Sequence, residues 1–294
     1  MDLNQLIFDR LTTDERIAGV LAKYAGTPAV FNTEFPSDQS EGWEGMEQYP
    51  RISYSYDTQA DPKRSSSGTL RIAVYTTRDM GKADEIEEMV RDRLKNVIMK
   101  PEEEAPFCVS WARTDPFEIE GTNILFKDIS FDILDFPEQI STTPDPALSM
   151  NLFLKSYMSN AFLVSYDDMG NTYEPTDEDP AIYVRIVSLS KMQETYALVF
   201  VNVQLAIHVI APTAEGRLKT VRILYDELFK RGEIDTEDGH GIMIEDIQAD
   251  AGADYLAAGQ ITVRGMYVMT SARVRSVPEI DKLRHVYMDF QGGE

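Results

Sequence analysis

The stretch Phe136-Pro137-Glu138-Gln139-Ile140-Ser141-Thr142-Thr143-Pro144-Asp145-Pro146 divides the 294-residue chain near its middle. It is rich in Pro and Thr, follows a strand-like run and precedes a helix-like one, which predicts an extended connector. A chain of this length suits two domains of ordinary size, each able to bury its own core. We therefore expect domains at 1–137 and 151–277, a linker at 138–150 and a C-terminal extension at 278–294.

The N-terminal half predicts the order helix, strand, strand, helix, strand, strand. Helical spacing of apolar residues and caps such as Asp14 and Asp79 define the helices, and alternation of apolar and polar residues defines the strands. The expected helices cover 3–11, 14–24 and 79–98, and the expected strands cover 51–56, 69–74, 107–111 and 125–136. On the helix that follows Asp79, Glu87 is expected to face water. The segment 27–49 is expected to be a loop.

The C-terminal half predicts the same order. The expected helices lie around 152–158 and over 213–231, and the expected strands cover 182–186, 201–209, 242–249 and 260–271. Matching elements are offset by roughly 135 residues, a domain-sized period. We infer an ancient tandem duplication and an α+β fold of two similar domains, each an antiparallel sheet packed by helices. The strand residue His208 is expected to be a half-exposed surface residue.

The chain is acidic, with 28 Lys and Arg against 50 Asp and Glu and a formal net charge of −22. This balance disfavours wrapping of a nucleic-acid backbone, because phosphate binding needs clustered basic residues. The single cysteine, Cys108, excludes an internal disulfide and lies in an apolar run, which predicts a buried structural thiol. The N-terminal residues do not resemble a signal peptide and no apolar run approaches bilayer length, so we expect a cytoplasmic protein without membrane contact.

Catalytic and metal motifs are weak. The best metal candidate is 235–246, whose acidic residues resemble a calcium loop only loosely, since Gly239 occupies a position where an oxygen ligand is expected. A turn that leads into a strand is the favoured interpretation. No phosphate-binding loop or nucleophile elbow is present, and nothing in the sequence positions the three histidines as a triad. We expect no enzyme, no cofactor and no metal.

Several residues resemble those of the tail terminator, or tail-completion, proteins of long-tailed bacteriophages and prophages. The likeness rests on Leu6-Ile7-Phe8-Asp9-Arg10-Leu11, on Tyr49-Pro50-Arg51-Ile52-Ser53-Tyr54, on 115–118 and 131–137, and on the order of elements. It covers much of the first half, through these stretches, and the second half mainly by element order. The chain departs from the family in having two such domains, which leaves open whether three or six chains would close a ring.

The resemblance implies a ring that caps the tail tube, stops its polymerisation and joins it to the head through a neck or connector protein. The implied partners are other copies of the chain, the tail tube protein and the connector, with DNA only as passing cargo. The implied locations are the host cytoplasm during assembly and then the virion tail. The hairpin loops 57–68 and 188–196 are the expected contact surfaces, and the expected contact residues are Trp43, Lys63, Arg64 and Lys191. Trp43 is also expected to anchor its own loop.

Three other functions remain open at the level of sequence. The chain could fill a different structural role in a virion, such as a baseplate, capsid-decoration or sheath-end protein. It could be a metal-dependent enzyme that uses 235–246. It could also be a small-molecule or peptide-binding module with one apolar pocket.

Overall fold

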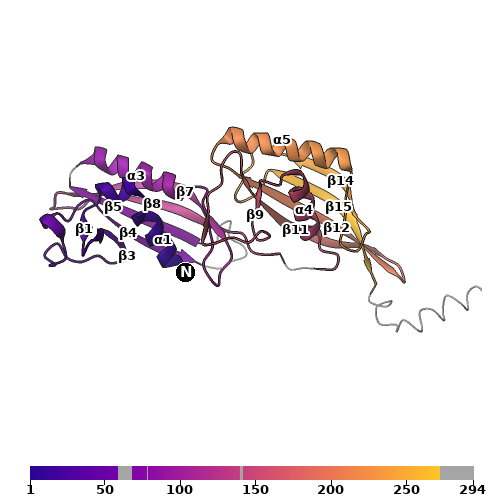
Figure 1. Cartoon of the computed structure of the whole chain (residues 1–294), viewed down its shortest axis with the longest axis horizontal. Coiled ribbons are helices and arrows are strands. Elements are labelled where there is room, and N and C mark those ends of the chain that lie inside the picture. The colour runs from indigo at the N-terminus through magenta and orange to yellow at the C-terminus, as the bar shows by residue number, and fades with distance from the viewer. Residues whose placement is uncertain (59–67, 78, 140–141, 272–294) are drawn as a thin grey trace, which may run out of the picture.

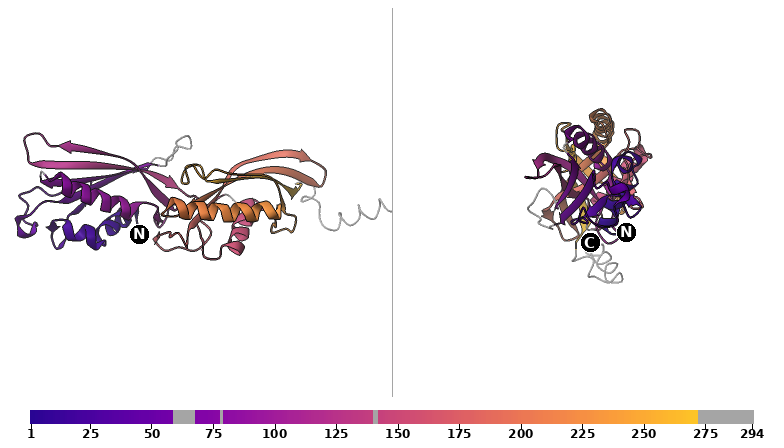
Figure 2. Two further views of the ribbon diagram at one scale, coloured as in Figure 1. Left: turned by 90° about the horizontal axis from the view of Figure 1, so that it is seen from above. Right: turned by 90° about the vertical axis from the view of Figure 1, so that its left-hand side faces the viewer.

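A computed structural model describes residues 1–58, 68–77, 79–139 and 142–271. The molecule is elongated and contains two large, mostly antiparallel β-sheets, each built mainly from one half of the chain (Figure 1). The α+β class expected from the sequence is confirmed. Figure 2 shows the helices of both halves on the same side of the sheets, with the β7–β8 and β11–β12 hairpins extending toward opposite ends of the molecule.

The N-terminal sheet has the strand order β10-β6-β7-β8-β5-β4-β3. Its strands are β3 (Val30–Asn32), β4 (Arg51–Thr58), β5 (Gly68–Thr77), β6 (Ile98–Met99), β7 (Phe107–Glu118), β8 (Ile124–Asp135) and β10 (Thr172–Tyr173). Helices α1 (Leu3–Thr12), α2 (Glu15–Val20) and α3 (Met80–Leu94) cover one face. The core is made of alternate strand residues, such as Leu70, Ile72 and Val74, and apolar helix residues, as the pattern predicts.

The C-terminal sheet has the order β13-β14-β15-β12-β11-β9. Its strands are β9 (Phe162–Leu163), β11 (Ala181–Glu194), β12 (Leu198–Ile210), β13 (Glu233–Ile234), β14 (Ile242–Ala249) and β15 (Ile261–Thr270), and its helices are α4 (Pro146–Tyr157) and α5 (Ala214–Arg231). Thr213 caps α5 by accepting from the Gly216 backbone N–H. Gly232 ends this helix with φ 71°, a left-handed conformation that favours glycine.

The two halves share an interface. Strand β10 comes from the C-terminal half of the sequence but pairs with β6 in the N-terminal sheet. An apolar cluster from both halves lies beside it: Ile98, Cys108, Leu134, Phe136, Phe162, Val164, Ala181, Tyr183, Ile210 and Leu256. Polar contacts also cross the interface, since Asn96 donates to the Ala211 carbonyl at 3.3 Å and accepts from the Tyr255 hydroxyl at 2.6 Å.

Several sequence expectations about the N-terminal half are wrong in detail. The helix expected to reach Tyr24 ends at Val20, and Lys23–Tyr24 is strand β1, paired with β2 (Thr27–Pro28). The helix expected to reach residue 98 ends at Leu94. The expected loop 27–49 contains β2, β3 and the short 3-10 helix η1 (Glu44–Met46). Short strands and helix ends are set by tertiary pairing, which local patterns do not encode.

Two side chains that the sequence predicts to be exposed or half-exposed are buried. Glu87 is 8% exposed instead of facing water, because Lys127 on β8 reaches its carboxylate. His208 is 1% exposed instead of half-exposed, because the interface between the halves covers the second face of β12. Helix α4 begins at Pro146, inside the range expected to be linker.

Candidate functional site

The β11–β12 hairpin extends beyond the part of its sheet that the helices cover (Figure 2). Every residue from Val187 to Ala197 is exposed, whereas Ala181 to Val184 at the start of β11 are buried. The turn is closed locally, since the Thr195 backbone N–H donates to the Leu198 carbonyl at 2.8 Å. The hairpin end therefore keeps regular strand structure without contributing to the core.

This projecting end carries large apolar side chains. Val187 and Leu189 are each 42% exposed, Met192 is 61% exposed and Tyr196 is 66% exposed. We call these four residues the hairpin surface. A group of exposed apolar residues on one projecting element is typical of an interaction site, in contrast to apolar residues scattered singly over a surface.

The outer edge of β11 is open over most of its length. Strand β9 pairs with β11 only at Ala181 and Ile182, and the Ile186 backbone N–H donates to the Gln139 side chain at 3.1 Å. In the described ranges, no strand pairs with this edge beyond Ile182. Register shifts follow Ile186 and Lys191. An open edge offers backbone donors and acceptors to a strand from another chain, and bulges limit where such a strand can pair.

The β7–β8 hairpin forms a second projection, at the opposite end of the molecule (Figure 2). Phe117 is exposed and stacks on Phe126 with ring centroids 5.0 Å apart, and Phe126 stacks on Tyr75 at 5.2 Å. This aromatic row crosses three strands and stiffens the hairpin through cross-strand pairs. Trp111 is also exposed, with the Arg91 guanidinium 4.7 Å from its ring centroid.

The residues expected to contact partners do not form one cluster. Lys191 lies on the projecting β11–β12 hairpin, where its ammonium pairs with Glu194. Trp43 lies in the other half, is half-buried and donates from its indole N–H to the Ser37 carbonyl at 3.0 Å. Its ring also packs edge-on against Tyr24 at 5.0 Å between centroids, as expected for a loop anchor. Lys63 and Arg64 lie outside the described residues, as does most of the loop 57–68.

Arg51 is a structural centre that sequence reasoning missed. Its guanidinium is buried, lies 3.8 Å from the Phe35 ring centroid, and donates to Asp38 at 2.7 Å and to the Tyr49 hydroxyl at 3.0 Å. These contacts fix the loop that contains Trp43 against β4. The only sequence signal was the density of aromatic residues around one arginine.

The metal candidate at 235–246 forms the turn between β13 and β14 and then, from Ile242, the first residues of β14. The Asp238 carboxylate accepts from the Thr236 hydroxyl at 2.7 Å and from the His240 backbone N–H at 3.2 Å, and the Thr236 hydrogen bond lowers the pKa of Asp238. This carboxylate thus serves the turn. In the described part of the chain, no group of three or more His, Cys, Asp or Glu side chains is placed to hold a metal ion.

The cysteine Cys108 and the histidine His208 are both buried. Cys108 is fully buried, as expected, and burial raises the pKa of its thiol to about 12. His208 lies between the halves, with Nδ1 3.0 Å from the Tyr255 carbonyl and Nε2 3.4 Å from Arg185 Nε. Burial lowers the pKa of His208 to about 4, so the ring is neutral at pH 7. A neutral ring that donates from Nδ1 and accepts at Nε2 fits both neighbours.

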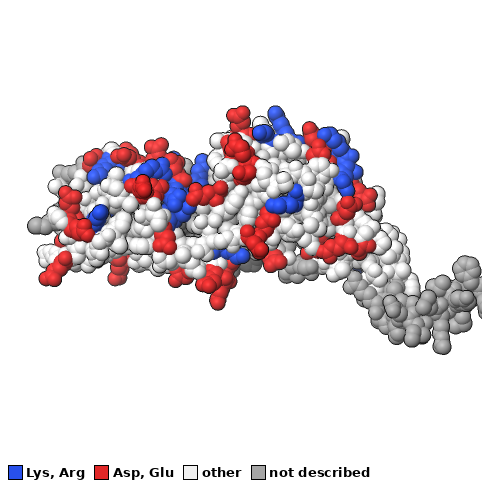
Figure 3. All heavy atoms as spheres, viewed as in Figure 1, with Lys and Arg blue, Asp and Glu red and all other residues white. Residues whose placement is uncertain are grey.

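Acidic and basic side chains are interspersed over the face shown in Figure 3, and the region near the end of the β11–β12 hairpin is mostly uncharged there. None of the described helices combines the length and the hydropathy needed to cross a bilayer.

Comparison with known proteins finds a weakly similar structure, but no family model and no curated protein matches the chain. A chain of a solved structure titled "Virion of native gene transfer agent (GTA) particle" is similar, with a TM-score of 0.34 and 16% identity over 45% of this chain and 92% of that chain.

Proposed function

We propose that this protein is a structural component of a phage or phage-like tail, in which copies of the chain form a ring that caps the tail tube, stops its polymerisation and joins it to the neck. The chain then acts by assembly and has no catalytic role. Its partners are other copies of itself, the tail tube protein and the connector. It works first in the host cytoplasm and then in the virion tail.

The observation that carries this proposal is the projecting β11–β12 hairpin with its exposed hairpin surface and open edge. Side chains such as Met192 and Tyr196 would lose contact with water in an interface, and burial of apolar area is the main driving force of association. The open edge adds backbone hydrogen bonds, which fix the register of the neighbouring chain.

A ring requires two different surfaces that meet head to tail. The β7–β8 and β11–β12 hairpins extend toward opposite ends of one chain, and both carry exposed aromatic residues, Phe117 and Tyr196. We propose that the hairpin surface of one copy meets the neighbouring copy, and that Lys191, which lies on the same hairpin, contributes to this contact. Contacts by Trp43, Lys63 and Arg64 belong to the same proposal.

The two sheets with helices on the same side support the inferred tandem duplication, with a first domain at 1–137 and a second domain whose first helix, α4, begins at Pro146. If both halves form ring contacts, three chains make a pseudo-hexamer. If only one half does, six chains make a two-tiered ring. The net charge of −22 suits a lumen through which DNA passes without adhering, because like charges repel.

The experiment is light scattering of the purified chain across micromolar concentrations, followed by negative-stain imaging of the same peak. A closed particle of three or six chains supports the proposal and decides between the two arrangements. Assembly into open-ended fibres, whose mass grows with concentration, would contradict ring closure.

A further inference from the structure

The two sheets have the same strand order, but their edges differ. The order β6-β7-β8-β5-β4-β3 in the N-terminal sheet corresponds to β13-β14-β15-β12-β11-β9 in the C-terminal sheet (Figure 1). Strand β14 therefore occupies the place of β7, and β11 occupies the place of β4. Because the topology is shared, a difference between corresponding edges indicates which half can pair with a strand from another chain.

The edges of the N-terminal sheet are largely covered or interrupted. Strand β3 pairs with β4 from Ile52 to Tyr54, which leaves only Ser55–Thr58 beyond it, and β10 covers β6. The part of β7 that follows Val109 contains Pro116, which lacks the N–H group that a ladder needs. Proline in an edge strand is one of the means by which natural proteins prevent pairing with other chains.

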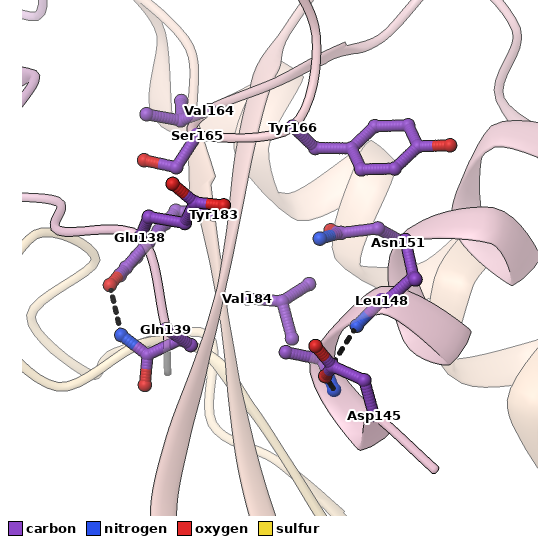
Figure 4. A pocket seen from close by; sticks show the side chains of 11 residues that line it. Glu138, Gln139, Asp145, Leu148, Asn151, Val164, Ser165, Tyr166, Tyr183 and Val184 are labelled. Carbon is purple, nitrogen blue, oxygen red and sulfur yellow. Dashed lines mark hydrogen bonds between the residues drawn. The ribbon is translucent and has the colours of Figure 1, made fainter. Parts of the chain in front are cut away.

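The C-terminal sheet has an open edge on each side. On the β11 side, the connector covers the edge as far as Ile186. There the Gln139 side chain accepts from the Ile186 backbone N–H at 3.1 Å and donates to the Tyr183 hydroxyl at 2.8 Å (Figure 4). On the β14 side, β13 pairs only with the first two residues of β14, and in the described part of the chain no other strand pairs there. Neither β11 nor β14 contains a proline.

The regular parts of these two open edges have equal length. Between its two register shifts, β11 pairs with β12 without interruption from Ser188 to Lys191, a stretch of four residues. After its own register shift, β14 pairs with β15 without interruption from Asp246 to Ala249, also four residues. Successive antiparallel pairs make β14 antiparallel to β11 within one sheet. A rotation that keeps the strand direction therefore brings β11 of one copy beside β14 of the next as an antiparallel pair.

The side chains on the two edges are complementary in charge. Strand β14 carries two acidic residues and no basic one, whereas β11 carries two basic residues and one acidic one. These residues are Glu245 and Asp246 on β14, and Arg185, Lys191 and Glu194 on β11. Two β14 edges would repel each other, whereas a β11 edge supplies the opposite charge. Met243 on β14 is 58% exposed and offers a flexible apolar contact to the hairpin surface.

We propose that the open edge of β11 in one copy pairs with the open edge of β14 in the next, so that the C-terminal sheets join into one continuous sheet around the ring. This inference rests on the proposed ring and names the strand that pairs with the hairpin. Each chain contributes one β11 edge and one β14 edge, so the contact is head to tail and closes by rotation. The N-terminal halves take no part in it, and the particle is the two-tiered ring of six chains.

The test is disulfide trapping in the full chain, with Ser190→Cys on β11 combined with either Gln248→Cys or Asp246→Cys on β14. All three residues are exposed, and the native Cys108 is buried. The two positions on β14 allow for a shift of register. Within one chain β12 and β15 separate β11 from β14 by about 14 Å, at about 4.8 Å per strand, which is too far for a disulfide. Every disulfide-linked product therefore joins different chains.

The controls are Ser190→Cys alone and Ser190→Cys/Ala112→Cys, which places the second thiol at an exposed position of β7. We expect at least one of the two β11–β14 pairs to give a linked ladder that ends at six chains, and both controls to stay unlinked on a denaturing gel. Light scattering of the reduced protein should give six chains.

Linked dimers from Ser190→Cys alone, or a ladder from the control with Ala112→Cys, would overturn the proposal, because β11 would then pair with itself or with the N-terminal sheet. A particle of three chains, or one of six chains without a ladder from either β11–β14 pair, would overturn it and leave the proposed function standing. A chain that is monomeric across micromolar concentrations would overturn both.

Discussion

Arg10 on α1 donates through Nη1 to the carboxylate of Glu174, 164 positions later in the chain. The same guanidinium donates to the Arg93 carbonyl from Nε at 3.2 Å and from Nη2 at 3.0 Å, and Arg93 donates to Glu174 at 3.2 Å. One buried arginine thus joins α1, the end of α3 and the segment after β10. These bonds help to hold the two halves together.

Arg10→Met should lower the free energy of unfolding by about 2–3 kcal/mol, because the Arg93 carbonyl loses two donors and Glu174 loses its main partner. Glu174→Gln keeps the shape of the side chain at position 174, and it should lower the free energy of unfolding far less near pH 7. Urea unfolding of both variants checks this. Equal losses in the two variants would contradict the role assigned to the Arg93 carbonyl.

Glu174→Gln should also change the response to acid. The Arg10 hydrogen bond lowers the pKa of Glu174 from 4.5, so its ionised form stabilises the folded chain above that value. This contribution is lost as pH falls through the pKa of the folded state. Unfolding of the variant should therefore depend less steeply on pH below about 4.5, as measured by circular dichroism during acid titration.

His208 should contribute a second pH dependence, at higher pH. Burial lowers its pKa from 6.5 to about 4, so the unfolded chain binds a proton first as pH falls. Stability should decline between these values by up to about 3 kcal/mol and then level off. His208→Gln should remove this slope between pH 6.5 and 4, whereas the exposed His240→Gln should retain it. Identical slopes in the two variants would show that His208 is not the group that titrates.

Lys127 should be essential for the charge cluster beneath α3. Its ammonium contacts Asp84 and the buried Glu87, and Thr114 donates to Glu87 at 2.8 Å. Burial opposes ionisation of Glu87, but the hydrogen bonds from Lys127 and Thr114 outweigh it and lower its pKa. Lys127→Met should lower the free energy of unfolding by about 3 kcal/mol, because it removes the buried cation of Glu87 and leaves this carboxylate only the longer, more exposed contact with Arg91 at 3.3 Å.

The double variant Glu87→Leu/Lys127→Met should lose less free energy of unfolding than Lys127→Met alone, because it removes the carboxylate together with its lysine partner. Lys230→Met, which removes an exposed lysine of α5, is the control and should leave urea unfolding unchanged. A double variant less stable than the single variant would contradict this interpretation.

Arg51→Met should release the loop that contains Trp43. The change removes the hydrogen bonds to Asp38 and Tyr49 and the stacking on Phe35. It should lower the free energy of unfolding by about 2 kcal/mol. In a Trp111→Phe background the fluorescence reports Trp43 alone, and its emission should shift to longer wavelength as the ring becomes hydrated. Arg51→Lys should not restore the wild-type spectrum, because lysine lacks the planar fork. An unshifted spectrum in Arg51→Met would contradict the role of the guanidinium.

The sequence predicted most of the long elements because their apolar residues follow a clear period. The alternation in β5 and in β12 up to Leu205 corresponds to the buried face of each strand, and Asp79 caps α3 as expected. The short strands β1, β6 and β10 were missed. Each has two residues, too few for a strand period to be visible. Strands β6 and β10 pair with each other across more than 70 positions, and β1 pairs with β2 across a tight turn.

The errors at Glu87 and His208 have a common cause. A helical or strand period assigns a face to each residue, but it does not show what covers that face. A lysine from β8 covers Glu87, and the other half of the molecule covers His208. The hairpin surface was partly predictable, since Leu189, Met192 and Tyr196 are apolar residues in a segment expected to be a loop.

The central claim is that the β11–β12 hairpin closes a ring, and the most direct measurement is the solution mass of a hairpin variant beside the wild type. Leu189→Asp/Met192→Asp places charges on the hairpin surface without touching the core, since both side chains are exposed. The control Ile223→Asp/Phe229→Asp changes exposed apolar residues of α5 instead. We predict a particle of three or six chains for the wild type and the control, and a folded monomer for the hairpin variant. A hairpin variant that assembles like the wild type would contradict the account.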